Sequence, residues 1–198
     1  MEVRTRNKIL NLIKKRKSIV SFSPEIPTQE EIALLFDAAR WAPSSRNAQP
    51  WRFIYATRKY GEEYDRFFNL LYEGNQLWAH SAPVLALSVA EVISEYKSKP
   101  NRYAFHDLGM AVGNLLTQAT SMGIYVHQMG GFDVEGARKA FNIPERFEPG
   151  AMIAIGYPGE IDHLPMELKR RELQKRTRKE VDEIVFRGTW NGSLDFKD

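Results

Sequence analysis

Apolar residues recur at helical spacing in several parts of the chain. The longest stretch covers residues 103–122, whose apolar stripe consists of Leu108, Ala111, Val112, Leu115, Leu116, Ala119 and Met122. This i, i+3, i+4 pattern predicts a central helix, and Gly123 follows at a position suited to a helix C-cap. A second helix is expected after Thr28, because Thr28 and Glu31 have the spacing of a capping box. Pro43 helps to end that helix.

The remaining pattern alternates between short helices and strands. Helices are predicted over residues 5–16, 60–72 and 134–141, with weaker helical character over residues 164–173. Strands are predicted at Arg52–Thr57, Pro83–Val89, Ile124–Met129 and Ala151–Ile155. The strand from Pro83 is apolar almost throughout, which is typical of a strand buried on both faces. Together these helices and strands predict an α/β or α+β sandwich that forms one domain, residues 1–198.

The C-terminal residues differ from the rest. Residues 185–196 contain Phe186, Trp190 and Phe196 but show no periodicity. Such a segment cannot bury its own aromatic rings, so we expect it to dock on its own domain or on a partner subunit.

Composition narrows the class of protein. The chain has 198 residues, 43% of them apolar, and no cysteine. A core is therefore expected, while disulfides, thiolate zinc sites and cysteine nucleophiles are excluded. No segment reaches 18 consecutive apolar residues, so no membrane span is expected. The N-terminus lacks the apolar region of a signal peptide, which favours the cytoplasm.

Common chemical motifs are missing. The sequence has no GxGxxG, GxxxxGK[ST], GxSxG or HExxH, and its four histidines lack metal-ligand spacing. We therefore expect no metal site. The net charge of +3 suits an anionic ligand as well as nucleic acid.

Two basic groups are candidates for binding an anion. Arg16, Lys17 and Ser18 could grip a phosphate through a guanidinium fork and a hydroxyl. Alternatively, they form an ordinary basic helix end. Arg176 and Arg178 lie two residues apart, so in an extended segment their side chains point the same way. Alternatively, the charged run around them is a solvated helix face.

Two further segments have the composition of binding loops. Polar side chains lie between the stiffening residues Pro43 and Pro50, and they could hydrogen-bond a heterocycle; these are Ser44, Ser45, Asn47 and Gln49. Met129, Gly130 and Gly131 follow a predicted strand, and the glycines would let a flat ligand approach the backbone. Both segments could equally be plain turns.

Six segments, taken together and in their order along the chain, resemble motifs of the FMN-dependent nitroreductase family. They are RKSIVSF (16–22), APSSRNAQPWRF (42–53), DLGMAVGNLL (107–116), HQMGGFD (127–133), IAIGYPGE (153–160) and RTRKEVDEIV (176–185). The resemblance covers roughly residues 12–190 and implies an α+β fold with a central, mostly antiparallel sheet flanked by helices. It also implies an intertwined homodimer, in which a tail of about residues 176–198 embraces the partner and FMN lies at the interface.

The same resemblance assigns the site residues. It places Arg16, Lys17, Ser18, Arg176 and Arg178 at the flavin phosphate end. It draws Pro43, Ser44, Ser45 and Asn47 from the other subunit, with Gln49 nearby. Met129, Gly130 and Gly131 would lie along the isoalloxazine, the Gly130 N–H facing N5, and Asn75 and Gln76 near the pyrimidine edge. No catalytic side chain is required, because the flavin carries the reaction.

The implied reaction uses NADH or NADPH to reduce a nitroaromatic, a quinone or a related small acceptor by a ping-pong mechanism of hydride transfer. One departure from the family is Val20, where many members have a basic residue near flavin N1 and O2; Arg52 or a helix N-terminus could substitute. Residues 91–102 are the only candidate for a lid over the site.

Two other functions remain open at this stage. A non-catalytic flavin-binding or flavin-delivery protein would share the site, and a nucleic-acid-binding module would use Arg16, Lys17 and residues 169–179. The order of the motifs favours the enzyme, without nucleic-acid or membrane partners.

Overall fold

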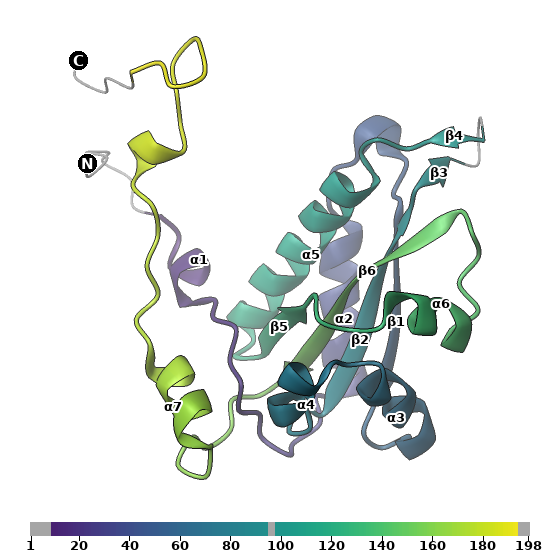
Figure 1. Cartoon of the computed structure of the whole chain (residues 1–198), viewed down its shortest axis with the longest axis vertical. Helices are drawn as coiled ribbons and strands as arrows, with labels where there is room; N and C mark the ends of the chain where they lie inside the picture. The colour runs from purple at the N-terminus through teal and green to yellow at the C-terminus, as the bar shows by residue number, and fades with distance from the viewer. Residues whose placement is uncertain (1–8, 95–97, 194–198) are drawn as a thin grey trace.

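A four-stranded antiparallel sheet lies at the centre of the computed structural model, which describes residues 9–94 and 98–193 (Figure 1). Its strand order is β1-β2-β6-β5, with β1 at Trp51–Thr57, β2 at Val84–Glu91, β6 at Phe147–Gly156 and β5 at Tyr125–Met129. Each neighbouring pair is antiparallel. The expected α+β class and antiparallel sheet are confirmed.

Helices cover both faces of this sheet. Alternate residues of β2 point to opposite sides, and because both sets are largely apolar, both faces have to be buried. Val84 and Ala86 face α2 (Gln29–Arg40) and α5 (Ala104–Ser121), whereas Leu85 and Leu87 face the other layer. That layer contains α3 (Gly61–Asn69), α4 (Glu73–Ala79) and α6 (Val134–Ala140) (Figure 1). Every residue of β2 is buried, as predicted for a strand covered on both sides.

The helix ends of the first layer follow from local chemistry. Thr28 Oγ1 accepts a hydrogen bond from the Glu31 N–H, and the Glu31 carboxylate accepts one from the Thr28 N–H, which is the predicted capping box. The predicted cap after α5 is also confirmed, since Gly123 has a φ of +73° that favours glycine.

The end of one predicted helix and the start of one predicted strand differ from the expectation. The helix predicted over residues 60–72 ends at Asn69, and the separate helix α4 follows. The chain turns there because Leu71 forms a bridge with Phe132 and the Leu70 carbonyl accepts the Asp133 N–H. β6 begins at Phe147 rather than Ala151, because its first residues pair with the end of β2.

Two peripheral predictions were also refined. Of the helix expected over residues 5–16, the described part is α1 (Asn11–Lys15), and residues 5–8 lie outside the described ranges. The candidate lid, residues 91–102, contains a two-stranded antiparallel pair, β3 (Ile93–Ser94) and β4 (Lys99–Pro100), with residues 95–97 not described.

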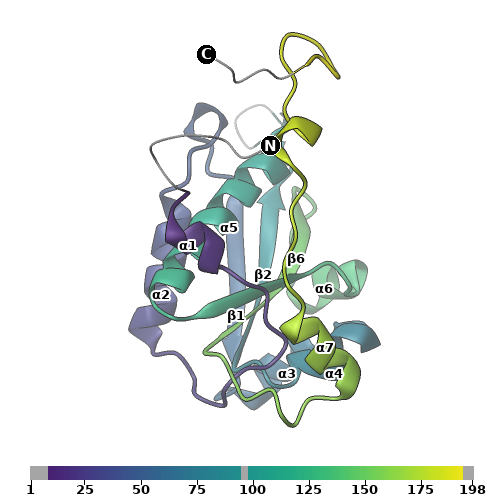
Figure 2. The same cartoon turned by 90° about the vertical axis from the view of Figure 1, so that its left-hand side faces the viewer.

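The segment that contains α1 and the segment that follows α7 run beside each other, apart from the sheet (Figures 1 and 2). α7 (Met166–Leu173) leads into an extended segment that passes α1 and contains one short 3-10 turn, Val181–Glu183. Trp190 is 84% exposed, and its ring centroid lies 5.2 Å from that of Phe186. Phe196, expected to dock with them, is outside the described residues.

Neither a membrane helix nor a metal cluster is found in the described part of the chain. Its helices are too short or too polar to cross a bilayer. It also contains no group of three or more histidine, aspartate or glutamate residues arranged to hold a metal ion.

Candidate functional site

Three arginines gather where the end of α1 meets the segment that follows α7. The Arg176 guanidinium donates to the backbone carbonyls of Lys14, at 2.6 Å, and of Arg16. Arg16 Nη1 donates to Ser18 Oγ at 3.0 Å. We call Arg16, Ser18, Arg176 and Arg178 the guanidinium cluster.

The charge of this cluster is unbalanced. Partial burial lowers the pKa of Arg16, and the positive charges of Arg176 and Arg178 lower it further. Within residues 9–94 and 98–193, none of the three arginines forms an ion pair with a carboxylate. Gathered like charges beside a hydroxyl form an arrangement that an anion would stabilise.

Lys17 points to a different partner. Its Nζ lies 2.6 Å from Glu172 Oε1, and it also donates to the Glu172 backbone carbonyl. The second carboxylate oxygen, Oε2, accepts the N–H of Val20 at 2.7 Å. The Glu172 side chain is 8% exposed and the Lys17 side chain 41%, so this ion pair is buried on the carboxylate side only. Lys17 therefore directs its charge toward α7, and its place at the flavin phosphate end stays a prediction.

His127 makes a second contact with α7. Its Nδ1 lies 2.7 Å from the Ile19 carbonyl oxygen, so Nδ1 carries the proton and donates it. Nε2 is then free to accept from Arg171, whose Nη2 lies 3.3 Å away. The ring stacks on Trp78 at 4.3 Å. Burial is the main cause that lowers the pKa of His127, and the Arg171 charge contributes, so the ring is neutral at pH 7.

The loop between α2 and β1 holds a strained backbone. Arg46, Asn47 and Gln49 all have positive φ, at 56°, 54° and 48°. Non-glycine residues adopt this region at a cost, and such clusters are characteristic of functional loops. Pro43, Asn47 and Gln49 are exposed, and Ser44 and Ser45 are half-buried.

Two hydrogen bonds hold this loop in place. The Ser45 N–H donates to Asp107 Oδ2 at 2.9 Å, and the Gln49 N–H donates to Ser44 Oγ at 3.0 Å. Asp107 lies on α5 and is only 3% exposed. Its other oxygen, Oδ1, lies 3.1 Å from His106 Nδ1. A buried carboxylate thus fixes a loop whose outer side chains face solvent.

The glycine pair after β5 is held from one side and open on the other. The Gly131 carbonyl accepts the Tyr72 N–H at 3.0 Å and Asn75 Nδ2 at 2.9 Å. A Cβ at Gly131 would lie 2.8 Å from Asn75 Nδ2, whereas a Cβ at Gly130 would meet no atom within 4 Å. Met129, one residue earlier, is buried in the core. The exposed Gly130 backbone is therefore accessible to a ligand.

One chain does not bring all the predicted site residues together. It joins Arg16, Ser18, Arg176 and Arg178. The α2–β1 loop lies at the upper end of the sheet in both views, whereas α7 lies at the lower end (Figures 1 and 2). The hydrogen bonds described for this loop run within the loop, to α5, to Arg52 and, through the Pro50 carbonyl, to the Glu91 N–H of β2.

Arg52 does not supply the basic side chain that is missing at the position of Val20. Arg52 donates to the carbonyls of Gln49 and Trp51, and its guanidinium lies 5.5 Å from the Phe147 ring centroid. Val20 itself is 1% exposed and packs in the core.

Sequence reasoning missed four polar residues near these groups: His127, Arg171, Glu172 and Asp107. Three of them contact partners that lie 44 to 155 residues away in the chain, and a local sequence pattern cannot predict such contacts. Asp107 could have been noticed, because it is an acid next to the apolar stripe of a central helix.

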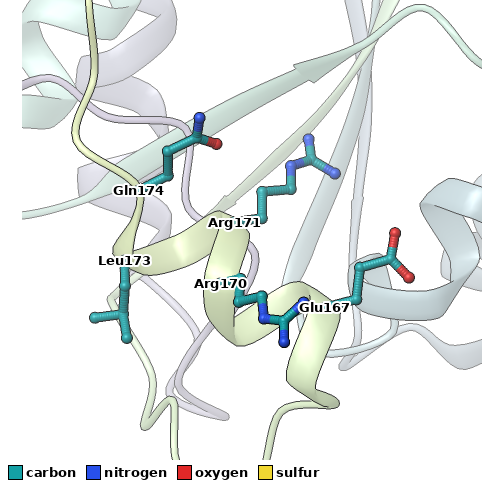
Figure 3. A pocket seen from close by; sticks show the side chains of 5 residues that line it. All are labelled: Glu167, Arg170, Arg171, Leu173 and Gln174. Carbon is teal, nitrogen blue, oxygen red and sulfur yellow. The ribbon is translucent and has the colours of Figure 1, made fainter.

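Open hollows flank the fold at two places. One, of about 550 Å³, lies along α7 and is lined by Glu167, Arg170, Arg171, Leu173 and Gln174 (Figure 3). Arg171 and Gln174 point from α7 to the same side, and Leu173 points the opposite way (Figure 3). The other, of about 270 Å³, lies between β1 and the segment before β6, next to Arg52 and Phe147.

Fold and site together define an α+β protein in which a cluster of basic side chains links residues 14–18 to the segment that follows α7. The chain belongs to the Nitroreductase family, whose family model matches residues 13–76 and 62–157.

Similar proteins agree with this membership. A solved structure described as an oxidoreductase containing FMN is 33% identical, covers 96% of each chain and has a TM-score of 0.88. A Methanothermobacter thermautotrophicus protein named "Putative NADH dehydrogenase/NAD(P)H nitroreductase" is 29% identical over 77% of this chain and 78% of its own. An uncharacterized 15.4 kDa protein of Mycolicibacterium smegmatis is 32% identical over 67% of this chain and 88% of its own.

Proposed function

We propose that this oxidoreductase of the Nitroreductase family binds FMN and takes reducing equivalents from NADH or NADPH. The observation that carries the proposal is the guanidinium cluster, in which Arg16, Arg176 and Arg178 gather without a described carboxylate. A phosphate monoester matches this arrangement, because it carries nearly two negative charges and accepts hydrogen bonds from guanidinium and hydroxyl groups.

Each remaining part of the site has a separate task in this proposal. Within the guanidinium cluster, the Ser18 hydroxyl would donate to the phosphate alongside the three arginines. Gly130 would present its N–H to the isoalloxazine edge, and Met129 and Gly131 would border the ring. When bound, FMN would supply the hydride chemistry, so no acid or base of the chain has to be assigned.

We further propose a homodimer that completes the site. The α2–β1 loop is fixed by Asp107 but lies away from the guanidinium cluster of its own chain. A second copy would bring its Pro43, Ser44, Ser45 and Asn47 to this flavin, with Gln49 nearby. The exposed Trp190 and the half-buried Phe186 beside it support this arrangement, because a tail of about residues 176–198 that embraces a partner would cover them.

The acceptor class follows from the family rather than from a single residue. A nitroaromatic, a quinone or a related planar molecule is the proposed acceptor, reduced after the nicotinamide leaves. The cytoplasmic location expected from the sequence stays a prediction.

The test is a visible absorption spectrum of the purified protein, taken before and after anaerobic addition of NADH or NADPH. We expect a flavin spectrum that bleaches, which would also identify the donor. A flavin spectrum that persists with both donors would indicate a flavin-binding protein without this activity. A colourless protein that takes up no added FMN would overturn the proposal and leave the basic residues to a nucleic acid or to solvent.

A further inference from the structure

Without a bound anion, the guanidinium cluster requires another interaction to hold its two chain segments together. Arg16 and Ser18 come from the N-terminal segment, whereas Arg176 and Arg178 come from a segment 160 residues later. Their like charges repel one another: partial burial lowers the pKa of Arg16, and the charges of Arg176 and Arg178 lower it further. The bonds from Arg176 end on backbone carbonyls, so they position this side chain without neutralising it.

The carboxylate of Glu172 joins the two segments next to the cluster. Glu172 lies four residues before Arg176 and binds Lys17, the neighbour of Arg16, at 2.6 Å. Its other oxygen accepts the Val20 N–H at 2.7 Å. The Glu172 side chain is 8% exposed, so water has little access to the carboxylate, although the Lys17 side chain is 41% exposed.

A second set of hydrogen bonds, through His127 of β5, connects the same two segments. Arg171, the residue before Glu172, reaches His127 Nε2 at 3.3 Å. His127 in turn donates from Nδ1 to the carbonyl of Ile19, the residue before Val20. The end of α7 is therefore held against residues 17–20 from both sides, and the extended segment that begins at Gln174 starts from a fixed point.

We propose that Glu172 is a positioning residue for the flavin phosphate: it anchors the end of α7 to residues 17–20 and so sets Arg176 and Arg178 against Arg16 and Ser18. Glu172 also turns the Lys17 ammonium toward α7, so Lys17 acts through the ion pair. This inference rests on the proposed function, since it concerns the site at which FMN would bind.

The experiment compares two flavins that differ only in the phosphate. The full-length protein is freed of flavin, and the Kd values for FMN and for riboflavin are measured by fluorescence titration for the wild type and for Glu172→Gln. Loss of the anchor should raise the Kd for FMN by about tenfold, the scale of one charged hydrogen bond. The Kd for riboflavin should change less than about twofold, because riboflavin makes no phosphate contact.

Matched variants separate positioning from other roles. Glu167→Gln makes the same charge change at an exposed position of α7 and should leave both Kd values unchanged. The double variant Lys17→Met/Glu172→Gln should bind FMN no more weakly than Glu172→Gln alone. A further loss in the double variant would show that Lys17 contacts the phosphate directly, and would overturn the proposal.

Other outcomes are equally informative. If Glu172→Gln leaves the FMN-to-riboflavin ratio of Kd unchanged, Glu172 does not position the phosphate site and the inference fails. If the wild type binds neither flavin, the proposed function itself fails. Thermal unfolding checks that Glu172→Gln folds; if it does not, Glu172→Asp, which keeps the charge but shortens the reach, enters the same comparison.

Discussion

At the scale of single residues, Arg16 shows how a side chain acquires a role that its own sequence context leaves open. Next to Lys17 and Ser18, it could equally have ended a helix. The structure brings Arg176 to its backbone and a second positive charge, that of Arg178, close enough to lower its pKa. Since no described carboxylate balances these charges, an anion is the expected partner.

Removing one of these arginines should weaken FMN binding specifically. We expect Arg16→Ala and Arg178→Ala each to cost about 1–3 kcal/mol of binding free energy, the range of a hydrogen bond to a charged group. Isothermal titration with FMN measures this cost. Arg66→Ala, which removes an exposed arginine on α3, is the matched control and should not change the affinity. Unchanged affinity in both test variants would remove these arginines from the site.

The two adjacent glycines should respond differently to the same change. In Gly131→Ala the new Cβ would displace Asn75, and loss of the Asn75–Gly131 hydrogen bond should lower the free energy of unfolding by about 1 kcal/mol. Gly130→Ala has open space and should stay within about 0.5 kcal/mol of the wild type. Urea unfolding of the flavin-free protein measures both. Equal effects would mean that the contact with Asn75 does not hold the turn.

At the scale of elements, α7, β5 and residues 17–20 meet at His127, and this meeting makes stability depend on pH. Burial lowers the pKa of His127 below its ordinary value of 6.5, helped by the charges of Arg171 and Arg16 and opposed by Glu172. The unfolded chain therefore takes up a proton at a higher pH than the folded protein does. Stability from this group is complete above about pH 6.5 and is lost as the pH falls toward the lower folded-state pKa.

Thermal unfolding at pH 7.5, 6.5 and 5.5 tests this dependence. The wild type should lose more stability on acidification than His127→Gln, which has no titrating ring. His163→Gln, a change at an exposed histidine, should keep the wild-type dependence. If His127→Gln loses as much stability on acidification as the wild type does, then this ring is not the source of the pH dependence.

The elements themselves were predicted unevenly, for a physical reason. α2 and α5 carry their signals locally, in the capping box at Thr28 and in an apolar stripe ended by Gly123. The break between α3 and α4 depends on Phe132, more than sixty residues away, which pairs with Leu71. A pattern read within one window cannot contain such a partner.

At the scale of the whole molecule, the proposed dimer can be tested by complementation. Arg16→Ala damages the guanidinium cluster and Asn47→Ala damages the α2–β1 loop, so each homodimer should bind FMN weakly. If the two groups come from different chains, a mixed dimer has one site with both defects and one site with neither. We expect co-expressed and co-purified mixed dimers to bind one FMN per dimer with wild-type affinity.

The controls for this test are the two parent variants and an Arg16→Ala/Asn47→Ala chain mixed with the wild type. In that mixture each site carries one defect, so no tight site should form. Tight binding there, or its absence in the first mixture, would place both residues at the flavin of a single chain. Sedimentation analysis establishes the oligomeric state of each preparation.

The sequence by itself determined what depends on neighbours along the chain: the caps and apolar stripes of α2 and α5, the buried strand β2, and the order of segments that indicates the family. Tertiary structure alone decided what depends on distant partners. It paired Glu172 with Lys17 and Val20, stacked His127 on Trp78, and gathered Arg16 with Arg176 and Arg178. Periodicity encodes which face of an element is buried, whereas a polar contact across 155 residues exists only once the core has brought the two segments together.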